Sequence, residues 1–180
     1  MSKFAKLTNL CIFSDNVIGK LLDIANNQHN WNTTYNHVDS TTKFVFTKLP
    51  GELESEILAN IPDQLKSFDP FIRLQITTGA GLGVHIDNGR TVSLLTPLTD
   101  DRSPTNFYEW APNATKQLED KLLVVDPGEL VLAETIVAEK NKTYLFNNSE
   151  PHCAGPINGT RVTVNILFNG ATFDQLVTLL

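Results

Sequence analysis

Apolar residues recur at helical spacing in two stretches of the first third of the chain. The first stretch, residues 15–28, begins at Ser14-Asp15, where either the serine or the aspartate can cap a helix. The second stretch covers 51–67, and Pro62 should end or kink it because the proline ring removes a backbone donor and clashes with the preceding turn. Residues 43–47, which lie between these two stretches, have the composition of a short strand. We therefore expect helices and one strand in this part of the chain.

Beyond Pro70 the pattern changes to short runs with a period of two. The runs that we expect to be strands are 71–77, 84–87, 91–98, 122–126, 130–138, 142–147, 152–156 and 161–168. Eight short strands separated by Gly, Pro, Asn and Asp are typical of a sandwich or barrel, and the jelly roll fits the count. The insert 99–121 carries several aromatic residues, and we expect it to form a flap near one mouth of the barrel.

The last expected strand separates polar from apolar side chains. Arg161, Thr163 and Asn165 fall on one face, and apolar residues alternate with them on the other. An apolar outer row needs a cover, which the two N-terminal helices would supply. We therefore expect one mainly β (α+β) domain over 1–180. Its parts would be a helical support region (1–70), a β core (71–168) and a C-terminal tail (169–180).

Composition narrows the class of protein. The 180 residues suffice for one domain, and 41% hydrophobic with 19% charged residues is close to the globular average. A net charge of −6 and the absence of a basic run argue against nucleic acid as a partner. The apolar run 10–13 is too short for a signal peptide or a membrane span, so we expect a soluble, cytoplasmic protein.

A glycine-rich bend leads into the candidate chemistry. His85 and Asp87 follow it two residues apart, so on a strand their side chains point the same way, which is half of a metal site. His29 and His37 lie in a polar segment and are most simply loop residues. His152, after an expected strand and turn, is then the candidate for the second histidine ligand.

Two imidazoles and one carboxylate form the facial triad of non-haem Fe(II) oxygenases, which leaves three coordination positions open. A keto acid that chelates such a metal needs a cation for its far carboxylate. Arg161, nine residues after His152, begins the inward row of the last strand, and a guanidinium can fork onto a carboxylate. An inward arginine needs an anionic partner, which a ligand would supply. The alternative is an ordinary salt-bridged strand residue.

These residues make the sequence resemble the 2-oxoglutarate- and Fe(II)-dependent oxygenases, in particular the prolyl-hydroxylase-like branch, with the aspartyl/asparaginyl-hydroxylase-like branch second. The matching stretches are 85–90, 144–148 and 152–165, within a resemblance that covers 71–168. The resemblance implies a double-stranded β-helix, iron held by His85, Asp87 and His152, and 2-oxoglutarate anchored by Arg161. It also implies hydroxylation by O2 with release of succinate and CO2, with ascorbate as an optional further cofactor.

Two residues distinguish between the branches. Gln75 stands ten residues before His85, where many prolyl hydroxylases carry a tyrosine that binds the cosubstrate. Asp87 is present, whereas aspartyl-hydroxylase-like members often lack this carboxylate, and this favours the prolyl-hydroxylase-like branch. Gln75, Ser93 and Asn165 are candidates for hydrogen bonds to the cosubstrate.

Three residues are candidates for substrate contacts: Arg90, Tyr108 and Trp110. The simpler alternatives are a solvated arginine and aromatic residues that pin the insert to the barrel. The expected substrate is a peptide, a protein or a small amino-acid-like molecule, with neither nucleic acid nor membrane as partner. Two other classes stay open, namely a cupin-like lyase or isomerase that uses the same ligands without oxygen, and a non-catalytic jelly roll.

Overall fold

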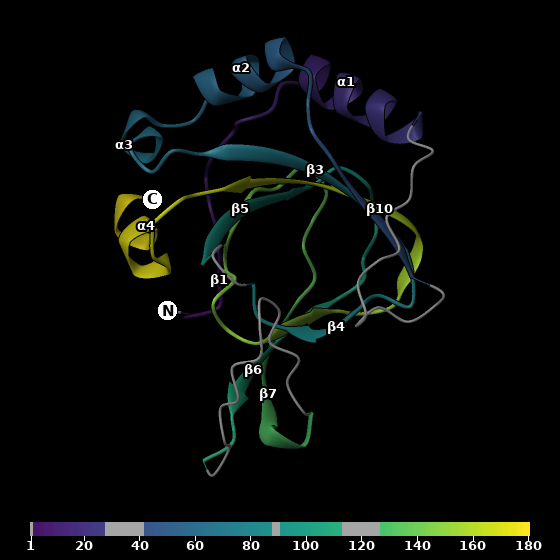
Figure 1. Ribbon diagram of the computed structural model, residues 1–180, viewed down its shortest axis with the longest axis vertical. Coiled ribbons are helices and arrows are strands. Elements are labelled where there is room, and N and C mark those ends of the chain that lie inside the picture. Colours follow the sequence, from purple (N-terminus) through teal and green to yellow (C-terminus); the bar gives the residue numbers. More distant parts are fainter. Residues whose placement is uncertain (1, 28–41, 88–90, 113–126) are drawn as a thin grey trace.

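The computed structural model describes residues 2–27, 42–87, 91–112 and 127–180 (Figure 1). Its strands are β1 (Ala5–Leu7), β2 (Lys43–Thr47), β3 (Phe71–Gly79), β4 (Leu82–His85), β5 (Val92–Pro97), β6 (Thr105–Trp110), β7 (Leu130–Ile136), β8 (Tyr144–Asn147), β9 (His152–Ala154) and β10 (Ile157–Leu167). Its helices are α1 (Asp15–Asn26), α2 (Gly51–Ala59), α3 (Asp63–Lys66), α4 (Phe173–Leu179) and the 3-10 helix Pro127–Glu129. Among the described residues, no helix has the length and apolar character needed to cross a membrane.

The strands form two antiparallel sheets. The larger sheet has the order β1-β8-β5-β10-β3-β2, and the smaller sheet has the order β4-β9-β6-β7. In Figure 1, β3, β5 and β10 lie on one side of the barrel-like body and β4 lies on the other. The β-rich, jelly-roll-type architecture predicted from the strand pattern is therefore confirmed.

Most of the expected elements are present at or near their predicted bounds. Ser14 caps α1, since its hydroxyl accepts a hydrogen bond from the Val17 amide at 3.3 Å. The second helical pattern is divided at Pro62, which is the residue before α3, as the missing proline donor requires. The strand expected at 43–47 is found without change, and the C-terminal tail ends in α4.

Three expectations about the strands need correction or comment. The insert 99–121 is not simply a flap, because β6 lies within it and pairs with both β7 and β9. Three of the six residues of β6 are aromatic, a residue type that is favoured in strands. β1 was missed because three residues are too few for a periodic signal, and β10 begins at Ile157, earlier than expected. The run 122–126 lies outside the described residues.

The outer face of the larger sheet packs against the helices. In Figure 1, α1 and α2 lie over β3. One buried cluster joins the helices to the sheet, with members Val17, Leu21, Leu53, Ile57, Leu74, Ile76, Val162, Val164 and Ile166. Because side chains alternate along a strand, burying Val162, Val164 and Ile166 under the helices turns Arg161, Thr163 and Asn165 toward the space between the sheets.

A second buried cluster lies between the two sheets. Phe107 is fully buried, with its ring centroid 5.5 Å from that of Phe4 and 5.4 Å from that of Phe146. Tyr144 belongs to the same cluster. Phe146 also lines the pocket described below, so this aromatic cluster borders the site.

Candidate metal and ligand pocket

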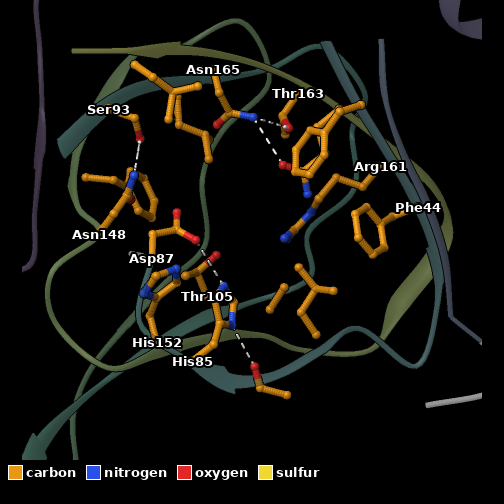
Figure 2. Close-up of a pocket in the computed structure, with 18 residues that line it drawn as sticks. Phe44, His85, Asp87, Ser93, Thr105, Asn148, His152, Arg161, Thr163 and Asn165 are labelled. Atoms are coloured by element: carbon orange, nitrogen blue, oxygen red, sulfur yellow. Dashed lines mark hydrogen bonds and ion pairs between the residues drawn. The ribbon is translucent and has the colours of Figure 1, made fainter. Parts of the chain in front are cut away.

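A pocket of about 140 Å³ lies between the two sheets. Figure 2 shows His85, His152 and Asp87 on one side of it, and Arg161, Thr163 and Asn165 across from them. The histidines come from the smaller sheet, and Arg161, Thr163 and Asn165 come from β10 of the larger one. The fold thus brings together residues separated by up to 80 positions, as the resemblance implied.

The two histidines face each other across neighbouring strands. His85 of β4 is the register partner of His152 of β9, and their ring centroids are 4.4 Å apart. Nδ1 of His85 lies 2.8 Å from the Gly83 carbonyl oxygen, and Nδ1 of His152 lies 2.9 Å from that of Glu150. A carbonyl only accepts, so each Nδ1 donates its hydrogen, which leaves each Nε2 lone pair available to a metal.

Asp87 stands beside this pair. Its Oδ1 lies 3.9 Å from Nε2 of His85, and its backbone amide donates to the Asn148 carbonyl oxygen at 3.1 Å. Asn148 in turn donates its own amide to Thr91 at 2.9 Å, so the turn after β8 fixes the backbone that carries the carboxylate. Asn148 lies in the matching stretch 144–148, but sequence reasoning assigned it no role of its own.

Two imidazoles and a carboxylate suit Fe(II), but the ligand atoms of His85, His152 and Asp87 do not converge on one position at bonding distance. Ligand atoms about 2.1 Å from a metal and at right angles to each other lie about 3 Å apart, so the 3.9 Å between His85 and Asp87 is longer than bound geometry requires. As the side chains stand, no group of three or more His, Cys, Asp or Glu among the described residues forms a closed metal set. Metal binding here would therefore require the Asp87 carboxylate and the imidazoles to approach each other more closely than they do in this structure.

Burial lowers the pKa of His152 to about 4, and the neighbouring His85 adds to this effect. Asp87 and the carbonyl of Glu150 oppose it by favouring the charged imidazole. His152 is therefore neutral at pH 7, which is the protonation state in which an imidazole binds a metal.

We expect His152 of the metal-free protein to titrate near pH 4, instead of near 6.5. The unfolded chain then takes up this proton at higher pH than the folded chain, so the free energy of unfolding should fall as the pH drops from about 6.5 to 4. Imidazole 15N chemical shifts report the titration directly. His152→Gln should lack this part of the pH dependence, and a His152 titration near 6.5 would contradict the expected burial.

Arg161 already has an anionic partner within the chain. Its Nε donates to Oδ2 of Asp101 at 2.7 Å, and its Nη2 donates to the backbone oxygen of Ser103. The side chains of Asp101 and Arg161 are 2% and 13% exposed. Arg161 therefore does not need a ligand to supply its anion, contrary to the prediction, and the salt-bridged alternative describes this structure. Arg161 nevertheless lines the pocket.

The other three residues predicted to bind the cosubstrate also line the pocket. Asn165 donates through Nδ2 to Oε1 of Gln75 at 3.2 Å and to Oγ1 of Thr163 at 3.4 Å. Ser93 accepts from Nδ2 of Asn148 at 3.1 Å. These side chains form a polar wall that continues from Arg161. Residues in the lining that sequence reasoning did not assign include Phe44, Phe46, Thr105, Asn148 and Thr163.

Tyr108 and Trp110, predicted to contact substrate, do not line the pocket. The Tyr108 hydroxyl lies 3.4 Å from Sγ of Cys153, and burial together with this contact raises the pKa of Tyr108 to about 12. Its neighbour Phe107 faces the site instead, with its ring centroid 5.7 Å from that of His152. Arg90 lies outside the described residues, so its role stays a prediction.

No family model matches the chain, and no curated protein matches it. Several solved structures, in contrast, are similar to the chain. A prolyl-4-hydroxylase from Pseudomonas putida shares 13% identity at a TM-score of 0.53, covering 92% of this chain and 91% of that one. A prolyl hydroxylase from Trichoplax adhaerens, in complex with a hypoxia-inducible-factor peptide, shares 15% identity at 0.52, covering 93% and 84%. HygX from Streptomyces hygroscopicus, with nickel, 2-oxoglutarate and hygromycin B bound, shares 10% identity at 0.56, covering 92% and 82%.

At these identities the similarity concerns the fold. The chain has the fold of the 2-oxoglutarate/Fe(II) oxygenases, prolyl hydroxylases among them, as the resemblance of its sequence predicted.

Proposed function

We propose that the protein is an Fe(II)- and 2-oxoglutarate-dependent dioxygenase, prolyl-hydroxylase-like, that hydroxylates a peptidyl or amino-acid-like substrate and releases succinate and CO2. The observation that carries the proposal is the facing pair of His85 and His152. Both rings have Nδ1 fixed by a backbone carbonyl, with Asp87 beside them and Arg161 across the same pocket. Fe(II), 2-oxoglutarate and O2 are the cofactors, with ascorbate as an optional reductant.

Each residue has a defined part in this proposal. The Nε2 atoms of His85 and His152 and the Asp87 carboxylate would hold the iron, which supplies the activation of dioxygen when bound. Arg161 would bind the distal carboxylate of 2-oxoglutarate, and the polar wall around Asn165 would orient the rest of that molecule. Apolar side chains at the pocket, such as Phe44 and Phe146, would limit the entry of water.

The proposed core is a double-stranded β-helix over 71–168 within a single domain. α1 and α2 would serve as its support, because they bury the face of β3 and β10 that is turned away from the pocket. The solved structures with this fold contain a peptide in one case and a small molecule in another, and both classes fit the proposed substrate.

Two measurements test the proposal. Anaerobic addition of Fe(II) and 2-oxoglutarate should give a weak visible charge-transfer band, and in air the protein should convert 2-oxoglutarate to succinate. The Zn(II)-loaded protein is the matched control, since zinc has no redox chemistry and should give neither signal. Absence of both signals from the Fe(II)-loaded wild type would overturn the proposal.

A second candidate is a cupin-like lyase or isomerase that uses the same metal without oxygen. The observation that favours it is the Asp101–Arg161 pair, which leaves no uncompensated cation at Arg161 for a keto acid. This candidate predicts metal binding without succinate formation, whereas a non-catalytic jelly roll predicts no metal binding.

A further inference from the structure

The guanidinium of Arg161 has one edge engaged and, within the part of the chain that the structure describes, one edge without a hydrogen-bond partner. Nε and Nη2, which lie on the same side of the planar group, donate to Asp101 and to the Ser103 carbonyl. Among the described residues, no hydrogen bond involves Nη1. Figure 2 shows Arg161 reaching into the pocket opposite the histidines, so the remaining Nη1/Nη2 edge is available on that side.

Asp101 is itself held in place through both carboxylate oxygens. Oδ2 accepts from Arg161, while Oδ1 accepts from Oγ of Ser103 at 2.5 Å and from its backbone amide at 3.3 Å. Asp101 and Ser103 are both buried. A buried carboxylate with three donors has little freedom to move, so it can fix the guanidinium that it contacts.

The segment that carries Asp101 is anchored to the connection between β9 and β10. The amide of Gly155 donates to the Pro104 carbonyl oxygen at 2.7 Å. The fit there is tight, because a Cβ added at Gly155 would lie 2.8 Å from Cγ of Pro104. These two contacts hold the end of the segment 101–104 against Gly155.

We infer that Asp101 is a positioning residue, which holds Arg161 by its Nε/Nη2 edge so that the Nη1/Nη2 edge meets the distal carboxylate of a dicarboxylate ligand. The inference rests on the proposed function for the nature of that ligand. It explains why Arg161 can be salt-bridged and still serve the pocket, since a guanidinium offers two separate edges to carboxylates.

The opposite possibility is that Asp101 only competes with the ligand for Arg161. The two possibilities predict opposite changes in dicarboxylate affinity when Asp101 is removed. A positioning residue strengthens dicarboxylate binding, so its removal weakens that binding. A competing anion weakens dicarboxylate binding, so its removal strengthens it.

The test compares Asp101→Ala and Asp101→Asn with Asp100→Asn as the matched control. Asp100 is the exposed neighbour, and within the described ranges its ion pair is with the exposed Arg102, at 3.4 Å. Calorimetry on the Mn(II)-loaded proteins measures Kd for 2-oxoglutarate and for oxalate, which chelates the metal but has no distal carboxylate. We expect the Kd for 2-oxoglutarate to rise at least about tenfold in Asp101→Ala, to rise less in Asp101→Asn, and to stay unchanged in Asp100→Asn. The Kd for oxalate should stay within about twofold throughout.

A second readout needs no cofactor. The Nε–H group of Arg161 should give an exchange-protected 15N–1H signal in the metal-free wild type, which Arg161→Lys identifies by removing it. This signal should persist in Asp100→Asn and be lost in Asp101→Ala. Because Asp101→Ala leaves a buried cation unpaired and lowers stability, the spectra are taken below its melting temperature. Asp101→Asn, which keeps the size of the side chain, gives an independent check.

The outcomes separate the inference from the proposed function. Unchanged or tighter 2-oxoglutarate binding in both Asp101 variants would overturn the inference, as would an equal loss of oxalate binding or a protected Nε–H in Asp101→Ala. Failure of the Mn(II)-loaded wild type to bind either ligand would overturn the proposed function instead, and the Nε–H signal would still decide whether Asp101 fixes Arg161.

Discussion

Replacing His152 by alanine should abolish both iron binding and the conversion of 2-oxoglutarate to succinate. The change removes one of two facing imidazoles and leaves only His85 and Asp87 at the proposed centre. Loss of an outer-shell partner alone costs about 10–100-fold in metal affinity or activity, so loss of a ligand should exceed about 100-fold. Anaerobic equilibrium dialysis with Fe(II) measures the first effect, and a succinate assay measures the second.

Cys153→Ala is the matched control for this experiment. Cys153 is the next residue of β9, but its side chain faces the Tyr108 hydroxyl instead of the pocket. We therefore expect wild-type iron content and wild-type succinate formation in Cys153→Ala. Equal iron binding by His152→Ala and the wild type would show that His152 is not a ligand, and equal losses in both variants would indicate a damaged strand.

Local periodicity was enough to predict which residues of the last strand face the pocket. A period of two places Arg161, Thr163 and Asn165 on one face, and in the structure the apolar alternate residues share one buried cluster with residues of α1 and α2. This prediction depends only on strand geometry, which sequence patterns report directly. The same rule was applied to His85 and Asp87 on an expected strand 84–87, but β4 ends at His85. Asp87 is held beside His85 by the hydrogen bond from its amide to the Asn148 carbonyl oxygen instead.

Contacts between distant segments could not be predicted in this way. Asp101 lies 60 residues before Arg161 in a polar, proline-containing loop, and no periodicity marks its burial. The expected flap was treated as one loop, so Tyr108 was assigned to the pocket, although β6 turns Phe107 inward and Tyr108 toward Cys153. The separation of the candidate ligand atoms is likewise a tertiary property, set by side-chain torsions that a sequence does not encode locally.

Replacing Leu21 by alanine should lower the free energy of unfolding by about 2–5 kcal/mol. Leu21 lies on α1 with none of its surface exposed, in the cluster that also holds Leu74 of β3 and Val164 of β10. Truncation removes buried apolar surface and leaves a cavity between helix and sheet, and both effects disfavour the folded state. Urea denaturation followed by circular dichroism gives the change, read from the midpoint at constant m value.

Leu22→Ala provides the matched control, because it deletes the same atoms from the next residue of the same helix. Leu22 is only partly buried at the margin of the cluster, so less apolar surface is lost and the decrease should be clearly smaller than for Leu21→Ala. Both variants should keep the wild-type Kd for 2-oxoglutarate well below their melting temperatures, since α1 packs on the side of the sheet away from the pocket. Equal destabilisation by the two variants would contradict the packing of α1, whereas a selective loss of ligand affinity in Leu21→Ala would show that the helix also determines the position of the inward row of β10.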